Sequence, residues 1–116
     1  MEKEYYIKIT DRVRELIAES STISVPPKLA DIRLELTTLA SNLSESLDDI
    51  LAFKGIKLEE WRQESGKANA AKMKWDASKE GQQEIYLRGW LNRIKDTRSA
   101  IKTRLDVYRD QNFNQY

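Results

Sequence analysis

The chain has 116 residues, of which 34% are charged and 40% hydrophobic, with a formal net charge of +1. That length suits one modest domain, and the composition favours helices with narrow apolar stripes over a thick globular core. Because the sequence contains neither Cys nor His, it excludes disulfides, Cys/His zinc sites and catalysis by a Cys nucleophile or a His base. No apolar run approaches the roughly 18 residues of a membrane span. We therefore expect a cytoplasmic protein that uses no cofactor.

The small net charge conceals a division between two parts of the chain. Residues 1–66 hold 9 Lys and Arg against 13 Asp and Glu, a balance of −4, whereas residues 67–116 hold 11 against 6, a balance of +5. A basic half is typical of a face that binds nucleic acid. Acidic and basic helices that pack together in one bundle give the same division.

The first predicted element is a helix over residues 3–20. Apolar side chains recur there on one helical face, at Tyr6, Ile9, Val13 and Leu16. Pro26 and Pro27 then end the pattern, because proline lacks an N–H and restricts the residue before it. Pro27 suits the first turn of a new helix, where the missing N–H costs nothing.

A long helix is predicted over residues 28–65. Its heptad seam consists of Leu29, Ile32, Leu36, Leu39, Leu43 and Ile50. Gly66 either stops or bends this helix, so an extension as far as residue 75 stays open. About 38 residues at about 1.5 Å each span roughly 57 Å, which indicates an elongated molecule.

The last predicted helix covers residues 79–110, with Ser78 as its N-cap. Its apolar face consists of Leu87, Trp90, Leu91, Ile94, Ile101, Leu105 and Tyr108. The chain is thus expected to be a single all-α domain over residues 1–116. Its architecture is an elongated antiparallel helical hairpin or coiled coil with an additional N-terminal helix. Apolar stripes that so thin a fold leaves uncovered favour a homo-oligomer.

The last helix also carries an ordered set of cations. Four of them recur every seven residues and flank the apolar seam, at Arg88, Lys95, Lys102 and Arg109. Arg93 and Arg104 flank the seam on its other side, and Arg98 lies close to the seam itself. A second, weaker basic cluster contains Lys72 and Lys74.

Cations repeated along one line suit a phosphate backbone, and an aromatic side chain beside them, at Tyr86, Trp90 or Tyr108, suits stacking on unpaired bases. The same cations are equally typical of the flanks of a coiled coil, where they pair with carboxylates of the neighbouring helix. Both interpretations remain open at the level of sequence.

The segment from Ala100 to Tyr108, AIKTRLDVY, resembles the K-x-R-L-D-x-Y helix of the phage recombination mediator family. The resemblance implies binding to single-stranded DNA, with Lys102 and Arg104 as DNA-binding residues. It also implies two protein partners, a RecA-like recombinase and the single-strand binding protein that the recombinase displaces. A family Trp that follows a Lys is similar to Trp75 after Lys74.

The leading hypothesis is a non-enzymatic accessory protein of phage recombination or replication that binds single-stranded DNA and helps to load a recombinase. No residue set indicates a catalytic or metal site. The alternative is a helical interaction or assembly module, such as a phage adaptor or an inhibitor of a host protein, that does not bind nucleic acid.

Overall fold

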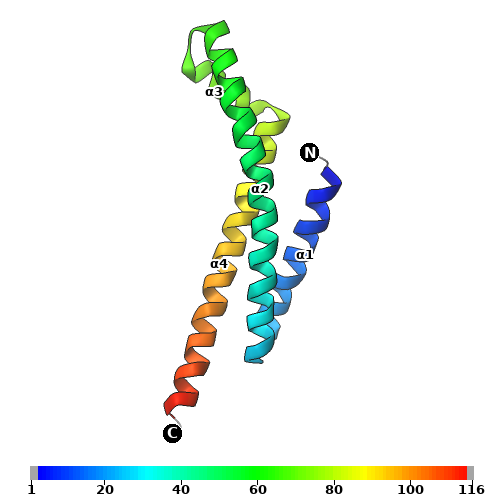
Figure 1. Ribbon diagram of the computed structural model, residues 1–116, viewed down its shortest axis with the longest axis vertical. Coiled ribbons are helices and arrows are strands. Elements are labelled where there is room, and N and C mark those ends of the chain that lie inside the picture. Colours follow the sequence, from blue (N-terminus) through cyan, green and yellow to red (C-terminus); the bar gives the residue numbers. More distant parts are fainter. Residues whose placement is uncertain (1–2, 115–116) are drawn as a thin grey trace. The chain divides into compact units, whose positions relative to one another are not determined.

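The computed structural model describes the backbone of residues 3–114 and the side chains of residues 7–111. Over this part of the chain there are four helices and no strand, as Figure 1 shows: α1 (Lys3–Thr22), α2 (Pro26–Ser65), α3 (Ala68–Ala77) and α4 (Lys79–Asn114). The long helices α2 and α4 run antiparallel, and α1 precedes them. The predicted all-α fold, a helical hairpin with an additional N-terminal helix, is confirmed.

The chain packs as two compact units. Unit 1 combines the residues up to Leu43 with those from Trp90 onward, and unit 2 contains Ser44–Gly89. Each unit therefore includes a part of α2 and a part of α4. From the length of the chain we expected a single domain over residues 1–116.

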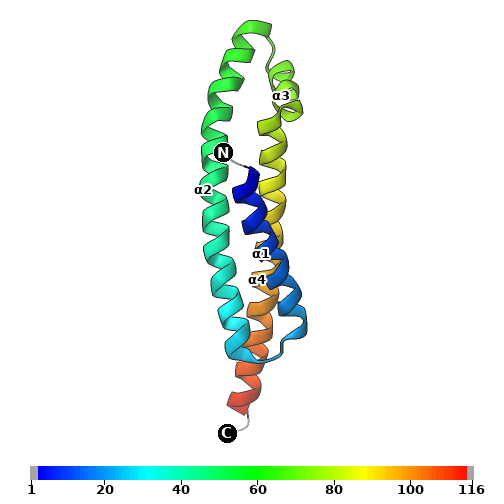
Figure 2. The ribbon, with the colours of Figure 1, turned by 90° about the vertical axis from the view of Figure 1, so that its right-hand side faces the viewer.

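Unit 1 is a bundle of α1, residues 26–43 of α2 and the part of α4 after residue 89 (Figure 2). Each helix buries the apolar face that its 3.6-residue period defines. The core comprises Ile9, Val13, Leu16, Leu29, Ile32, Leu36, Leu43, Trp90, Ile94 and Ile101. Pro26 and Pro27 occupy the first turn of α2, and the first N–H groups after them, those of Lys28 and Leu29, donate to the Val25 carbonyl at 3.1 Å.

Unit 2 consists of residues 44–65 of α2, the short helix α3 and the first turns of α4. Its buried apolar side chains are fewer, namely Leu47, Ile50, Ala71, Trp75 and Leu87. Gly66 ends α2 with a positive φ of 70°, and its N–H donates to the Arg62 carbonyl at 2.8 Å. This left-handed residue suits glycine and closes the last turn of the helix. The extension of the long helix to residue 75 is therefore replaced by a turn and a separate helix.

The α3–α4 turn is built around Ser78. Its Oγ accepts the N–H of Gly81 at 3.0 Å, as an N-cap of α4 should, and donates to the Trp75 carbonyl at 2.5 Å. A Cβ at position 81 would lie 1.8 Å from the Trp75 carbonyl oxygen. The turn thus closes only because residue 81 has no side chain.

Candidate nucleic-acid interface

The Arg104 side chain of α4 binds backbone carbonyls at the end of α1. One amino group of its guanidinium, Nη1, donates to the Ser20 carbonyl, and Nη2 donates to the Ile23 carbonyl at 2.6 Å. The Ser20 carbonyl belongs to the last turn of α1, where carbonyls have no intrahelical partner, and the Ile23 carbonyl follows the helix directly. A cation at this position bonds both carbonyls and balances the helix dipole. Arg104 therefore joins α1 to α4 inside unit 1. The sequence offered no local signal for this contact, because the partners lie more than 80 residues apart.

The direction of Arg104 fixes the directions of its neighbours on α4. With 3.6 residues per turn, a side chain two positions away points roughly 160° round the helix. Lys102 therefore points away from α1, and Lys95 and Arg109, seven positions on either side of it, share that direction. All three are exposed, and none makes an ion pair with any side chain that the structure describes.

The α2 side of the same surface is cationic as well. Glu35 faces α1, where Arg12 binds it, so Arg33, two positions earlier, faces away from α1. Arg33 and Arg98 are half-buried, and within the described side chains their Nε atoms are buried without a hydrogen-bond partner. An N–H in that state is an unmet donor close to the surface.

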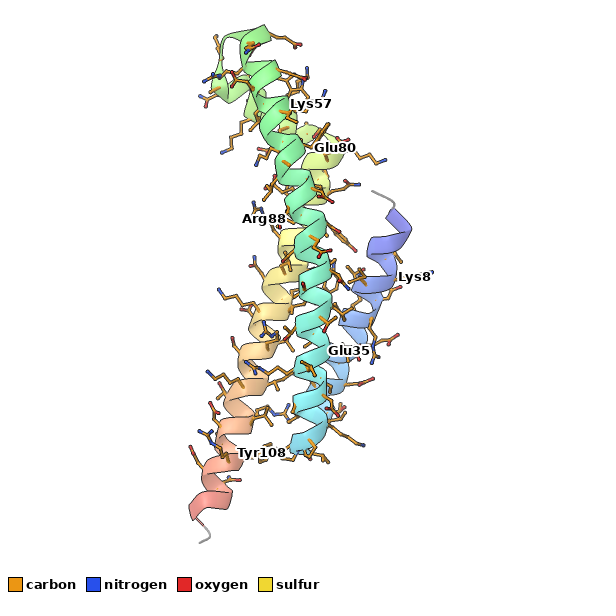
Figure 3. All side chains as sticks on the ribbon, viewed as in Figure 1. Lys8, Glu35, Lys57, Glu80, Arg88 and Tyr108 are labelled. Atoms are coloured by element: carbon orange, nitrogen blue, oxygen red, sulfur yellow. The ribbon has the colours of Figure 1, made fainter. Side chains whose placement is uncertain are left out.

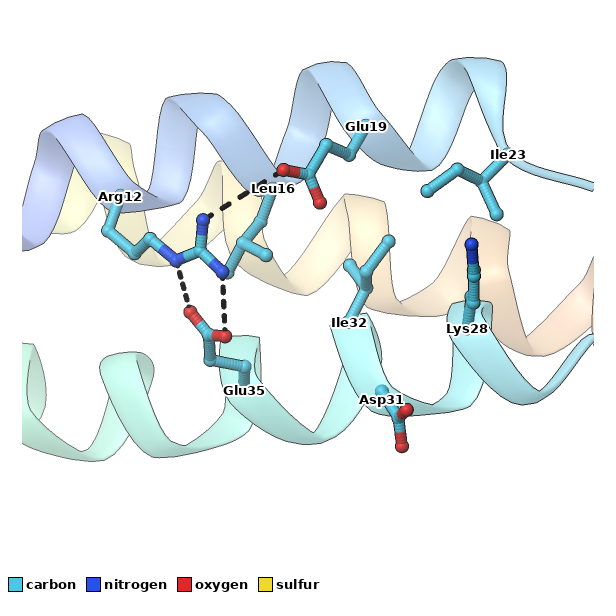
Figure 4. Close-up of a pocket in the computed structure, with 8 residues that line it drawn as sticks. All are labelled: Arg12, Leu16, Glu19, Ile23, Lys28, Asp31, Ile32 and Glu35. Carbon is cyan, nitrogen blue, oxygen red and sulfur yellow. Dashed lines mark hydrogen bonds and ion pairs between the residues drawn. The ribbon is translucent and has the colours of Figure 1, made fainter. Parts of the chain in front are cut away.

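We call this surface of unit 1 the basic face. Its cations are Arg33, Lys95, Arg98, Lys102 and Arg109, and the carboxylates on the same side of α4 are Asp106 and Asp110. Of the α2 carboxylates in this unit, Glu35 points towards Arg12 of α1 (Figure 4), and Asp31, two positions before Arg33, lies on the opposite side of the helix from Arg33. The basic face thus carries a net positive charge that unit 1 does not neutralise.

Arg88, the fourth cation of the predicted stripe, belongs to unit 2 (Figure 3). Its Nε donates to Glu84 Oε2 at 2.8 Å, one turn earlier on α4. The ion pair is half-exposed, with 51% of the Arg88 side chain accessible. Arg88 thus belongs to the other unit and already binds a carboxylate there.

Arg93 and Trp90 lie on the other side of α4, against α1. The Trp90 ring is covered by two guanidinium groups, with the Cζ of Arg14 at 4.8 Å and that of Arg93 at 4.6 Å from its centroid. Trp90 is only 4% exposed. Stacking of this indole on a base, one of the sequence-based alternatives, is therefore wrong, and Arg93 contributes a cation–π contact to the core.

The two tyrosines considered for stacking are also away from the basic face. Tyr86 is exposed but belongs to unit 2. Tyr108 is half-buried on α4 one turn after Arg104, which places it on the α1 side (Figure 3). Among the side chains that the structure describes in unit 1, none therefore places an exposed aromatic ring beside the cations of the basic face.

Lys72 and Lys74 lie on α3 in unit 2, where both are exposed. The Nζ of Lys74 is 4.7 Å from the centroid of the Trp61 ring. A cation on an aromatic face partly satisfies its charge within unit 2. These two lysines thus belong to unit 2, whereas Lys102 belongs to unit 1.

Glu84 forms a polar cluster in unit 2 that sequence reasoning missed. This buried carboxylate accepts from Lys54 Nζ at 2.9 Å, from Trp75 Nε1 at 2.9 Å and from Arg88 Nε at 2.8 Å. Burial raises its pKa, but these three hydrogen bonds more than offset that effect and lower the pKa to about 2. The cluster is a structural anchor for the indole, because all of its charge is satisfied internally.

Arg12 and Glu35 tie α1 to α2 at the edge of a shallow cleft of about 300 Å³ (Figure 4). The pair is bidentate, with Nε–Oε2 at 2.5 Å and Nη2–Oε1 at 2.9 Å. The hydrogen bonds from Arg12 lower the pKa of Glu35. The two polar groups satisfy each other, so they hold the bundle together and are not offered to a ligand.

Other kinds of site are not found in the described part of the chain. Among the described side chains of residues 7–111, no cluster of three or more carboxylates converges as metal ligands. None of the helices described there has the length and apolar content that crossing a bilayer needs. Comparison with protein-family models, curated proteins and solved structures gave no match.

Proposed function

We propose that this protein is a non-enzymatic accessory protein that binds single-stranded nucleic acid through the basic face of unit 1. The observation that carries the proposal is the row formed by Lys95, Lys102 and Arg109, which is exposed and has no ion pair among the described side chains. Successive members are about 10 Å apart along the helix axis. A row of uncompensated cations suits a flexible chain of phosphates.

The mechanism is electrostatic. Each cation that neutralises a phosphate releases a bound counterion, so binding weakens with salt by a logarithmic slope of about −0.7 per contact on a single strand. Three to five contacts give a slope of roughly −2 to −3.5. Half-buried Arg33 and Arg98 add two further positive charges to the basic face. One copy binds weakly by this route, and several copies on one strand raise the overall affinity.

The resemblance to the phage recombination mediators supports single-stranded DNA as the ligand and recombinase loading as the role. Lys102 fits that assignment, because it lies on the basic face. Arg104 is assigned here to the α1–α4 contact, so its contribution to binding is through the stability of unit 1. The proposed partners are a RecA-like recombinase and a single-strand binding protein, and the proposed location is the cytoplasm, including that of an infected host cell.

Fluorescence anisotropy with labelled single- and double-stranded oligonucleotides, each at low and at high salt, tests this proposal. The variant Lys95→Gln, Lys102→Gln, Arg109→Gln is expected to lose at least about tenfold in affinity at low salt and to show a shallower salt slope. The matched control is Lys72→Gln, Lys74→Gln, Lys79→Gln, which removes the same charge from unit 2. If both triple variants bind alike, the basic face is not the site.

A second candidate is a helical interaction module that does not bind nucleic acid. It is favoured by the exposed apolar side chains of unit 2, which include Ile56 at 61%, Met73 at 73% and Ile85 at 57% exposure. Such side chains are typical of surfaces that bind another protein. A salt-insensitive complex with a protein partner, together with no binding of either oligonucleotide, favours this candidate over the first.

A further inference from the structure

Unit 2 carries a surface of opposite charge on α2. Lys54 points towards α4, where it binds Glu84 at 2.9 Å, so the helical period defines the opposite, outward direction. Five carboxylates lie within about 60° of that direction. They are Glu45, Asp48, Asp49, Glu59 and Glu60, all exposed, and no Lys or Arg of residues 44–65 shares this sector. We call this surface the acidic face.

The charge of the acidic face is largely uncompensated. Glu45, Asp48 and Asp49 make no ion pair with any described side chain. Glu59 and Glu60 each bind a cation one turn away on α2, at 3.0 Å and 3.3 Å, in exposed pairs that contribute little. Like charges on one side of a helix repel one another. A cationic partner would reduce this repulsion between the carboxylates, which persists in the monomer.

The centre of the acidic face is apolar. Ile56 is 61% exposed, and Ala52, one turn earlier, is exposed beside it. An apolar centre with a charged border is the usual anatomy of a protein–protein contact, in which the centre excludes water and the border selects the partner. The surface therefore has the form of a docking site for a protein whose matching surface is basic.

We propose that the occupant is a second copy of this chain, which docks the basic face of its unit 1 on the acidic face and competes there with a nucleic-acid strand for the same cations. The chain itself supplies the complement, with five carboxylates on one face and five cations on the other. The rows also match in length, since 14 residues separate Glu45 from Glu59 and Lys95 from Arg109. Each separation is about 21 Å along a helix, so both ends of one row can meet both ends of the other.

The contact has a defined consequence for assembly. Each copy carries one acidic and one basic face, so two copies either close a symmetric pair, in which the contact is made twice, or leave one face of each kind open to further copies. Exposed ion pairs are individually weak and are screened by salt. Association is therefore expected on the order of tens of micromolar protein at low ionic strength, and dissociation at high ionic strength.

Sedimentation velocity without nucleic acid tests the proposal. The wild type is expected to sediment as a larger species at low salt and as a monomer at high salt. The acid-reversed variant, Asp48→Lys with Asp49→Lys, and the base-reversed variant, Lys95→Glu with Lys102→Glu, are each expected to stay monomeric alone. Mixed in equal amounts they are expected to associate again, because each then offers the charge that the other requires. The control, Lys72→Glu with Lys79→Glu, alters neither face and should behave as the wild type.

Three results would overturn the proposal. They are a wild type that is monomeric at every concentration and salt, reversed variants that associate as the wild type does, and a mixture of reversed variants that stays monomeric. Circular dichroism of each variant shows that the helices are intact, so a loss of association is not a loss of folding. Because no oligonucleotide is present, failure here is distinct from failure of the nucleic-acid assignment, which anisotropy measures separately.

Discussion

Units 1 and 2 are both built from parts of α2 and α4, but unit 1 exposes cations on them and unit 2 exposes carboxylates. In unit 1 the Glu35 carboxylate of α2 binds Arg12 of α1, and Lys95, Lys102 and Arg109 are left at the surface. In unit 2 the cations Lys54 and Arg88 are bound to buried Glu84, and the carboxylates of α2 point outward. The local packing partner of a helix, and not the composition of the helix, therefore decides which of its charges remain available.

The units also differ in how they are held together. Unit 1 buries apolar side chains from three helices around Val13, Leu36 and Ile101. Unit 2 has a smaller apolar core and depends on Trp75 and its hydrogen bond to Glu84. Unit 2 should therefore be the less stable of the two and the more sensitive to the loss of a single side chain.

The largest effect is expected from Trp75→Ala. The indole is fully buried, so its removal should reduce the free energy of unfolding by about 3–5 kcal/mol and leave the Glu84 carboxylate with one donor fewer. Urea denaturation measures the loss, and hydrogen exchange should localise it to residues 44–89. The control Trp61→Ala, at a half-buried position, should cost clearly less. Equal losses in the two variants would contradict the central role of Trp75.

The next effect concerns pH and Glu84. Its pKa is about 2 in the folded protein against 4.5 ordinarily, so its contribution is fully present above pH 4.5 and is lost as the pH falls towards 2. This lowering of the pKa corresponds to about 3–3.5 kcal/mol. Glu84→Gln should remove that part of the pH dependence of unfolding, measured by circular dichroism in urea.

Glu35 in unit 1 also has a lowered pKa, but Glu35 is present in both the wild type and the Glu84→Gln variant. The difference between wild type and Glu84→Gln therefore isolates Glu84. Glu45→Gln, at an exposed position, is the control and should retain the wild-type pH dependence. Identical pH profiles for wild type and Glu84→Gln would show that the cluster does not stabilise unit 2.

A smaller effect separates Arg104 from Lys102. Arg104→Ala should reduce the stability of unit 1 by about 1–2 kcal/mol, because two carbonyls at the end of α1 lose their donor. Lys102→Ala should change stability by less than about 0.5 kcal/mol but weaken oligonucleotide binding at low salt. Thermal unfolding and anisotropy measure the two properties. If Arg104→Ala kept the wild-type stability but bound oligonucleotide poorly, Arg104 would be a residue that contacts the nucleic acid.

The smallest effect is expected at two glycines of α2. Gly66→Ala should cost about 1 kcal/mol, because an L side chain rarely adopts the positive φ of this position. Gly55→Ala should instead stabilise the helix by about 0.5–1 kcal/mol, since the added Cβ would meet nothing within 4 Å. Thermal unfolding of both variants gives the signs, and a stabilising Gly66→Ala would contradict the observed end of α2.

Helical periodicity and helix-ending residues predicted most of the fold. The spacing of Val13 and Leu16, of Leu29 and Leu36, and of Ile94 and Ile101 identified side chains that the structure buries. Ser78 was predicted as the cap of α4, and its Oγ accepts the N–H of Gly81. These features are local, because they depend on residues within a few turns of one another, and a single sequence contains that information.

Much of the candidate site could not be predicted in the same way. Seven-residue spacing placed Lys95, Lys102 and Arg109 on one line of α4, but it gave the same status to Arg88, which Glu84 binds. It also treated Arg104 and Lys102 alike, although one bonds to α1 and the other faces solvent. The spacing of residues along α4 does not predict which side of this helix another helix, here α1, will cover.

The sequence by itself determined the all-α class, the positions of the long helices and the apolar stripe of each, because helix period and capping act within one segment of chain. Only the tertiary structure decided which charges are satisfied and which are offered to a partner. The physical reason is that an ion pair or a capped carbonyl requires two groups far apart in the chain to meet within about 3 Å. The packing of α1 against α4, and of Trp75 against Glu84, brings such groups together. The charges that these contacts leave unpaired form the basic and acidic faces.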